Sequence, residues 1–388
     1  MNSEFARAMS HATASVRAGK LVDATALIQA ALAGRPEPGA ASASPAQARR
    51  VAPDIEDAEV VDVWPAAPPA PESGPRRSLR EVLTLLRGGR AMLDDIGPLT
   101  HPGSRPPAPQ VPEGARFLWR DHACAAGTRR YRLFIPSCPR SELRGLVMML
   151  HGCKQDPDDF AVGTGMNALA EEARMIVAYP EQPGAANISR CWNWFEPAHQ
   201  ARDGGEPAIL ADIARELAKE FAIAAPRVYV AGLSAGGAMA AVLGATHPDV
   251  FAAVGIHSGL PYRSASNVAS AFAAMRGQGP GVSRPAAGHA PRTIVFHGES
   301  DRTVHPSNAT ALVAGLAADR EETRETGRTA GRGWSRLRRR GADGRTAVEL
   351  WFVEGAGHAW SGGDAAGSFT DACGPSASAE MLRFFAGE

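Results

Sequence analysis

The hydrophobic and polar positions of residues 115–388 alternate between two periods. Short apolar runs predict buried strands, and segments with apolar residues every three or four positions predict helices. The predicted strands are 130–135, 146–150, 175–179, 227–231, 251–256, 293–296 and 348–353, and the clearest helices are 207–221 and 306–318. Several strands are continuously apolar, as burial on both faces requires. The pattern predicts an α/β fold with a mostly parallel sheet and helices on both faces.

The first 114 residues differ from this domain. Residues 1–34 predict a small helical hairpin, whose apolar stripe a single unit of this kind cannot bury by itself. Half of the 30 prolines fall between residues 35 and 112, and such Pro-rich segments stay extended. We therefore expect a linker over 35–114, with one short helix at 78–96, between the hairpin and the domain 115–388.

Charge and hydropathy exclude several classes of partner. The chain has 41 basic and 41 acidic residues, so no electrostatic footprint argues for nucleic acid or an anionic membrane surface. No apolar run approaches the roughly 20 residues that span a bilayer. The basic cluster 336–340 is interpreted as a solvated loop face beside the acidic Glu321 and Glu322.

The cysteines and the N-terminus point to different compartments. The first residues lack the basic and apolar regions of a Sec signal peptide, which favours the cytoplasm. Cysteine is frequent enough for an oxidising compartment and permits up to two disulfides. The number is odd and no Cys-x-x-Cys spacing occurs, which argues against structural zinc. The five cysteines are Cys124, Cys138, Cys153, Cys191 and Cys373.

The stretch 228–239, VYVAGLSAGGAM, carries the clearest chemistry. An apolar strand ends in Gly-Leu-Ser-Ala-Gly and passes at once into small, helix-compatible residues. This is the strand, sharp turn and helix of a nucleophile elbow, with Ser234 at its tip. The flanking glycines suit a turn that leaves no space for side chains.

A serine hydroxyl needs a base and a group that orients the base. Asp301 follows the strand at 293–296, and His358 follows the strand at 348–353. Ser234, Asp301 and His358 then occur in the chain order of an α/β-hydrolase. Glu299 and Asp364 are alternative orienting carboxylates, and His297 also follows a strand.

An acyl-transfer site also needs backbone donors for the oxyanion. We expect one donor to be the amide of Ala235, which follows the serine. The second should come from the loop 151–155, HGCKQ, directly after the strand 146–150.

These stretches resemble the type 1 catalytic domain of short-chain polyhydroxyalkanoate (PHB) depolymerases and their esterase relatives, including feruloyl esterases. The resemblance covers roughly residues 131–363 in the family's order. It rests on MLHGCKQD, GTGMNALAEEA, AYPEQ, CWNWF, GGEPAIL, VYVAGLSAGGAMA, FAAVGIHSGLPY, TIVFHGESDRTVHP and GHAWSGG.

The resemblance implies the same triad and an oxyanion hole near His151 and Cys153. It also implies a disulfide between Cys153 and Cys191, and it suggests Trp192, Trp194 and Trp360 as walls of an acyl or polymer subsite. The activity implied is hydrolysis of hydroxyalkanoate esters through an acyl-enzyme, without metal or cofactor.

Three alternatives stay open at this point. The substrate could instead be a feruloyl or acetyl-xylan type ester. The hairpin 1–34 could dock the chain on a polymer granule or a partner. Family resemblance favours an extracellular location, whereas the absence of a visible signal peptide favours the cytoplasm. The chain ends at Glu388 without a further substrate-binding module, so we expect amorphous polyester, oligomers or small esters rather than crystalline polymer.

Overall fold

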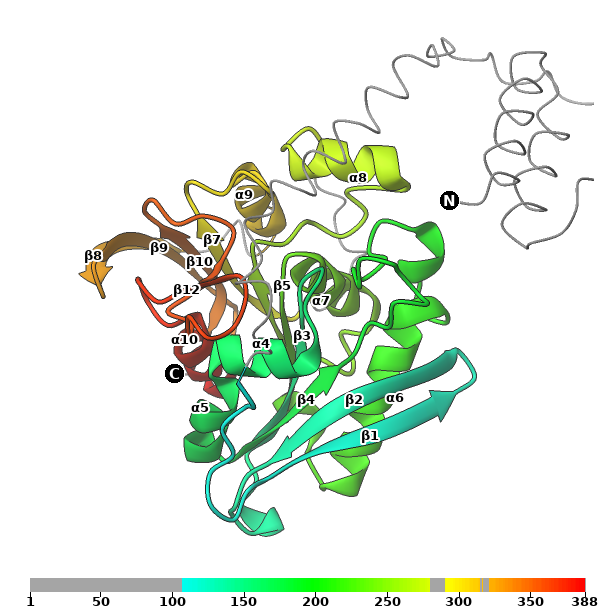
Figure 1. Ribbon diagram of the computed structural model, residues 1–388. Helices are drawn as coiled ribbons and strands as arrows, with labels where there is room; N and C mark the ends of the chain where they lie inside the picture. Colours follow the sequence, from blue (N-terminus) through cyan, green and yellow to red (C-terminus); the bar gives the residue numbers. More distant parts are fainter. Residues whose placement is uncertain (1–106, 280–289, 315, 317–320, 388) are drawn as a thin grey trace, which may run out of the picture. The chain divides into compact units, whose positions relative to one another are not determined.

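The computed structural model describes residues 107–279, 290–314, 316 and 321–387 (Figure 1). The predicted hairpin 1–34, the linker up to residue 106 and the helix at 78–96 lie outside the described residues. From residue 107 to the first strand at Arg116 the chain forms turns and irregular structure.

A 10-stranded sheet forms the centre of the domain, in the order β1-β2-β4-β3-β5-β6-β7-β10-β9-β8. The strands from β4 to β10 in this order run parallel, and an antiparallel pair flanks them on each side. The strands are β1 Arg116–Cys124, β2 Gly127–Ile135, β3 Gly145–Leu150, β4 Met175–Pro180, β5 Val228–Leu233, β6 Ala253–His257, β7 Arg292–Gly298, β8 Glu322–Thr329, β9 Arg332–Arg340 and β10 Thr346–Val353; a small second sheet pairs β11 Trp360–Ser361 with β12 Thr370–Asp371.

Helices cover both faces of the sheet. One apolar cluster joins the sheet to α6 Gly205–Glu220, α7 Ala235–Thr246, α8 Val268–Met275 and α9 Ser307–Val313. The other joins it to α4 Pro157–Thr164, α5 Met166–Ala173 and α10 Ala377–Ala386. Short 3-10 helices occur at Arg140–Glu142, Pro197–His199 and Ala225–Arg227. None of the helices in the described part of the chain has the length and apolar character to cross a bilayer.

The central strand β3 shows why its sequence is continuously apolar. Leu146, Met148 and Leu150 pack in the first cluster, whereas Val147 and Met149 pack in the second. Successive side chains of a strand point to opposite faces, so burial on both faces requires an apolar residue at every position. The α/β fold with a mostly parallel sheet, predicted from this pattern, is confirmed.

The sequence pattern missed the edge strands. All seven predicted strands are present within three residues of their expected limits, but β1, β8 and β9 were not predicted. The interpretation of residues 336–340 as a loop face is wrong, because these residues belong to β9. Their arginines face carboxylates of β8: Arg336 and Arg338 pair with Glu325, and Arg339 pairs with Glu322. The strands β8 and β9 consist mostly of charged and small polar residues, which give no apolar period to recognise.

Candidate active site

Ser234 lies at the sharp turn between β5 and α7, as the nucleophile elbow predicts. Its backbone angles, φ 56° and ψ −118°, are rare for a residue with a side chain and mark a strained position. The Ser234 amide donates a hydrogen bond to the carbonyl of His257, 2.9 Å away at the end of β6. The side chain is half-buried at the carboxyl end of the parallel strands.

The two glycines of the elbow are required by close contacts. A Cβ atom on Gly236 would lie 2.1 Å from the carbonyl oxygen of Leu150 and 2.6 Å from that of His151. A Cβ atom on Gly232 would lie 2.4 Å from the carbonyl carbon of Gly236. The backbone around the serine therefore packs directly against the end of β3.

Asp301 and His358 are in direct contact. The Nδ1 atom of His358 lies 2.7 Å from Oδ2 of Asp301, and the carboxylate is inaccessible to solvent. Oδ1 of Asp301 accepts hydrogen bonds from the amides of Thr303 and Val304, at 2.9 and 2.8 Å. The loop after β7 thus fixes the carboxylate, which fixes the imidazole.

The charge of this carboxylate follows from its neighbours. Burial works against the charged form, but His358 and His297 outweigh that effect and hold the pKa of Asp301 well below its usual range. An ionised carboxylate only accepts hydrogen bonds, so Nδ1 of His358 carries the proton in this contact. The Nε2 atom is then the lone-pair nitrogen that a general base needs.

The alternative carboxylates do not make this contact. Glu299 and Asp364 are exposed, and Asp364 accepts from the amide of Ala366 in its own turn. His297 is buried, and its Nε2 lies 2.8 Å from the carbonyl of Val304 and 3.4 Å from Oδ2 of Asp301. The ring of His297 is therefore a second, buried neighbour of the Asp301 carboxylate.

The loop after β3 presents backbone donors near the elbow. The Gly152 amide donates to Oε1 of Gln155 (2.9 Å), and the Lys154 amide donates to the carbonyl of Ser189 (2.8 Å). The amide of Cys153 between them has no acceptor among the residues that the structure describes. The amide of Ala235 is the first of α7 and lacks an acceptor within its own helix. The amides of Cys153 and Ala235 are therefore both free to donate, as the predicted oxyanion hole requires.

His151 lies directly after β3, as expected, and its ring makes hydrogen bonds with the backbone. Its Nε2 accepts a hydrogen bond from the Gln182 amide (3.1 Å), so its Nδ1 carries the proton and donates to the carbonyl of Gly152 (2.8 Å). Burial lowers the pKa of His151 to about 4, which keeps the ring neutral. Both ring nitrogens are occupied by the backbone, so the ring holds the loop and offers no donor to an oxyanion.

The expected disulfide between Cys153 and Cys191 is present, with a Cα–Cα distance of 4.2 Å. Cys124, Cys138 and Cys373 are free thiols. The disulfide ties the loop 151–155, the predicted oxyanion loop, to the CWNWF segment 191–195.

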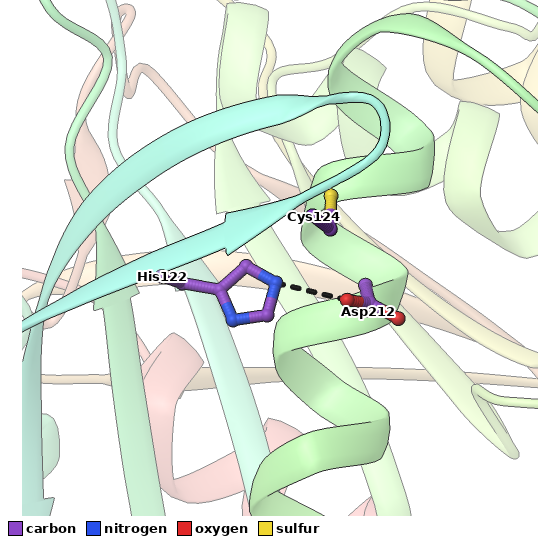
Figure 2. Close-up of side chains that lie close together, drawn as sticks. All are labelled: His122, Cys124 and Asp212. Carbon is purple, nitrogen blue, oxygen red and sulfur yellow. Dashed lines mark hydrogen bonds and ion pairs between the residues drawn. The ribbon is translucent and has the colours of Figure 1, made fainter.

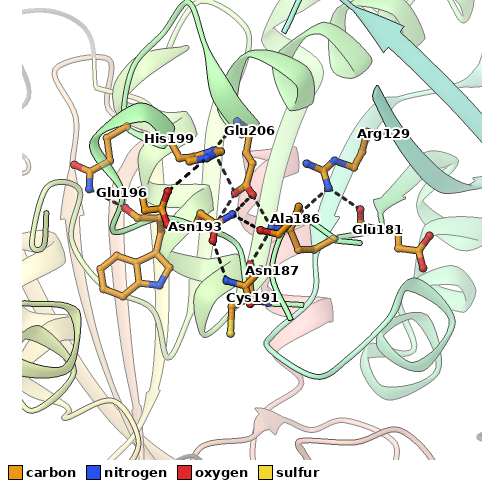
Figure 3. A network of polar contacts seen from close by, with 12 residues as sticks. Arg129, Glu181, Ala186, Asn187, Cys191, Asn193, Glu196, His199 and Glu206 are labelled. Atoms are coloured by element: carbon orange, nitrogen blue, oxygen red, sulfur yellow. Dashed lines mark hydrogen bonds and ion pairs between the residues drawn. The ribbon is translucent and has the colours of Figure 1, made fainter. Parts of the chain in front are cut away.

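The buried carboxylate of Glu206 also anchors the CWNWF segment (Figure 3). Glu206, 1% exposed, accepts hydrogen bonds from the amide and side chain of Asn193 and from the side chain of Gln182. Arg129 in turn donates to the side chain of Gln182. These buried hydrogen bonds therefore hold residues 182–206 in place.

The three tryptophans suggested as subsite walls are core residues. Trp192, Trp194 and Trp360 are 0, 6 and 1% exposed. Trp192 donates to the carbonyl of His151 at 3.0 Å, and Trp360 stacks on the ring of His257. Because the three rings are buried, they present no surface to a substrate. They pack beneath the loops of the site and support them.

His257 is a site residue that the sequence reasoning missed. Its carbonyl accepts from the amide of Ser234, and its Nε2 accepts from the amide of Ser361, at 3.0 Å, in the short strand β11 that follows His358. The sequence offers one signal for this residue, because His257 is a polar residue at the end of an otherwise apolar strand.

The chain is similar to known esterases and depolymerases. Residues 129–331 match the family model described as esterase PHB depolymerase. The chain is 34% identical over 229 residues to poly(3-hydroxyalkanoate) depolymerase C of Paucimonas lemoignei, covering 55% of this chain and 54% of the relative. It is 28% identical over 201 residues to acetylxylan esterase A of Talaromyces purpureogenus, covering 47% and 51%. The chain thus spans about half the length of these relatives.

A solved structure shows the same fold. The acetyl xylan esterase from Aspergillus awamori superposes with a TM-score of 0.56 at 18% identity, covering 70% of this chain and 100% of that one. The family model covers just over half of the 388 residues and includes the elbow, the oxyanion loop and Asp301. The chain therefore belongs to the esterase PHB depolymerase family.

Proposed function

We propose that this protein is a serine carboxylesterase that hydrolyses the ester bonds of poly(3-hydroxybutyrate)-type polyesters or their oligomers. The observation that carries the proposal is the 2.7 Å contact between Nδ1 of His358 and the buried carboxylate of Asp301. It lies at the same edge of the sheet as the strained elbow of Ser234. Family membership supports the reaction class, and the name of the Paucimonas lemoignei relative supports the polyester.

The mechanism uses the triad as an acyl-transfer centre. Oγ of Ser234 attacks the ester carbonyl while Nε2 of His358 takes its proton, and Asp301 keeps the ring in the productive tautomer. The amides of Ala235 and Cys153 stabilise the oxyanion of the tetrahedral intermediate. The histidine then protonates the departing alcohol, which leaves an acyl-enzyme.

Water completes the cycle. Nε2 of His358 removes a proton from water, the hydroxide attacks the acyl carbon, and the proton returns to Oγ of Ser234 as the acid leaves. Every proton transfer is carried by the histidine, so the mechanism requires neither a metal nor a cofactor.

A direct test compares the wild type with Ser234→Ala on p-nitrophenyl butyrate and on an amorphous polyhydroxybutyrate suspension. We expect the wild type to hydrolyse both and Ser234→Ala to lose at least about 10⁴-fold in kcat. Ser266→Ala, an exposed serine, is the matched control and should retain full activity. Undiminished activity in Ser234→Ala would refute the proposed nucleophile.

A second candidate is an esterase acting on acetylated or feruloylated plant polymers. The relative from Talaromyces purpureogenus, named an acetylxylan esterase, supports it. Rates on acetylated xylan, a feruloyl ester and a hydroxybutyrate oligomer, measured side by side, separate the two. A kcat/KM that is highest for a plant ester would replace the polyester substrate and leave the triad intact.

A further inference from the structure

One face of β1 is turned towards a row of acidic residues on α6. Arg120, His122 and Cys124 alternate along the strand and therefore lie on one face of it. The acidic residues Asp212, Glu216 and Glu220 recur every four positions along α6 and share one face of the helix. The two rows meet at the outer edge of the sheet, away from the elbow strand β5 in the strand order.

One end of this contact is an ordinary ion pair. The guanidinium of Arg120 donates to both carboxylate oxygens of Glu220, at 2.5 and 3.0 Å. At the other end the strand has no second arginine. Instead, the imidazole of His122 and the thiol of Cys124 face the carboxylates of α6. These nitrogen and sulfur donors are the ligands that zinc prefers.

The ring of His122 has carboxylates at both nitrogens. Its Nε2 lies 3.0 Å from Oδ2 of Asp212, and its Nδ1 lies 2.7 Å from Oε2 of Glu216. The residue is only 7% exposed. A carboxylate oxygen thus lies within hydrogen-bond distance of each ring nitrogen.

The thiol of Cys124 completes a set of three metal-binding groups. Figure 2 shows its sulfur near the ring of His122 and the carboxylate of Asp212. The ligand atoms of these residues all lie within 4.8 Å of one another. Bond lengths of about 2.0–2.3 Å to zinc place tetrahedral ligand atoms roughly 3.3–3.8 Å apart. Small side-chain rotations would therefore bring the three atoms to a metal.

We propose that His122, Cys124 and Asp212 form a binding site for a zinc-class divalent metal ion. Nε2 of His122, the thiolate of Cys124 and a carboxylate oxygen of Asp212 coordinate the ion, and water takes the fourth position beside the half-exposed aspartate. Glu216 accepts a hydrogen bond from Nδ1 of His122 and orients the ring, as second carboxylates do for metal-bound histidines. The ion fastens the edge hairpin β1–β2 to α6.

Cysteine spacing alone does not predict this site. His122 and Asp212 are 90 residues apart in the chain, so only the packing of α6 against β1 brings the ligands together. The site is independent of the proposed esterase function, since it shares no residue with the triad or the oxyanion loop.

Cobalt(II) titration tests the site, because a coordinated thiolate gives cobalt a charge-transfer absorption. The full chain, freed of metal with a chelator, should bind one cobalt ion with this absorption, and zinc should displace it. Cys124→Ser should abolish the absorption, and Glu216→Gln should weaken binding by about 10–100-fold. Zinc should also raise the Tm of the wild type and leave that of Cys124→Ser unchanged.

Control variants test whether Cys124 is the thiol that binds cobalt. Cys138→Ser and Cys373→Ser remove the other free thiols and should bind cobalt like the wild type. Circular dichroism and the metal-free Tm show whether each variant is folded, and Asp212→Asn replaces Cys124→Ser if the latter is not. A wild type without the absorption, or an absorption unchanged in Cys124→Ser, would overturn the proposal.

Discussion

A hydrogen bond between His257 and Ser361 joins β6, the strand beside β5, to the segment that follows His358. The Nε2 atom of the buried His257 accepts the backbone amide of Ser361 at 3.0 Å, and its Nδ1 lies 3.1 Å from Oγ of Ser258. The carbonyl of the same histidine accepts the amide of Ser234. One residue thus positions both Ser234 and the segment that follows His358.

We predict that His257→Phe reduces kcat by roughly 10–100-fold, the effect of a small misplacement of a catalytic group. Phenylalanine preserves the stacking on Trp360 but leaves the Ser361 amide without an acceptor, at a cost of about 1–3 kcal/mol. Steady-state kinetics on a soluble ester and urea unfolding measure the two effects. His305→Ala, an exposed histidine, is the control, and an unchanged kcat in His257→Phe contradicts the positioning role.

Asp301→Asn should leave the fold intact and lower kcat by about 10⁴-fold, because an amide can hold His358 in the wrong tautomer. The measurement is kcat on p-nitrophenyl butyrate together with Tm. Glu299→Gln, at the exposed alternative carboxylate, should retain activity. If Glu299→Gln were the inactive variant, the orienting carboxylate would have been misassigned.

Gly236→Ala should destabilise the protein by about 3 kcal/mol or more, the upper end of the cost of overpacking. The added Cβ atom would meet the carbonyl oxygen of Leu150 at 2.1 Å and that of His151 at 2.6 Å, and both are backbone atoms, which cannot turn away as a flexible side chain can. Chemical unfolding provides the measurement. Gly184→Ala is the control, since a Cβ atom there meets nothing within 4 Å. Equal stability of the two variants would show that the elbow can relax.

Removing the disulfide with Cys191→Ser should cost about 3–4 kcal/mol, from the chain entropy of a loop closed over 38 residues. It should also lower kcat, because the loop that carries the Cys153 amide loses its tether. Cys138→Ser, at a free thiol, is the matched control for both measurements. A Cys191→Ser variant with unchanged kcat would indicate that Gln155 and its partners suffice to hold the loop.

Acidification should destabilise the protein before the carboxylates titrate. Burial lowers the pKa of His151 to about 4, and burial with the neighbouring His297 and His358 lowers that of His257 to about 3. Unfolded histidine titrates near pH 6.5, so below this pH the unfolded chain binds protons that the native state does not. Stability is therefore fully present above about pH 6.5 and falls as the pH drops towards the folded values.

The size of this effect can be measured by urea unfolding at about pH 6.5 and about pH 5. Each buried histidine should contribute a loss of about 1–2 kcal/mol between these values, at 1.36 kcal/mol per unit of pH. His257→Phe should show a smaller loss than the wild type. Equal losses in both proteins would mean that His257 takes up its proton in the native state.

The sequence by itself determined the local features of this protein. The period of apolar positions predicts β3 and β5 because each residue there must suit burial on one face or the other. The elbow around Ser234 is recognisable from five consecutive residues, because a strand that turns sharply into a helix around a serine needs glycine on both sides of it. The order of Ser234, Asp301 and His358 along the chain suggests their roles from chemistry alone, and the family resemblance adds the disulfide.

The tertiary structure decided which distant residues meet. Only the placement of β10 beside β7 brings His358 to Asp301, 57 residues away. Packing also turned Trp192 and Trp360 from expected subsite walls into buried supports, occupied both ring nitrogens of His151, and brought His122 to Asp212. The physical reason is that burial and hydrogen bonding of a side chain depend on the neighbours that the strand order provides, and no local sequence pattern specifies those neighbours.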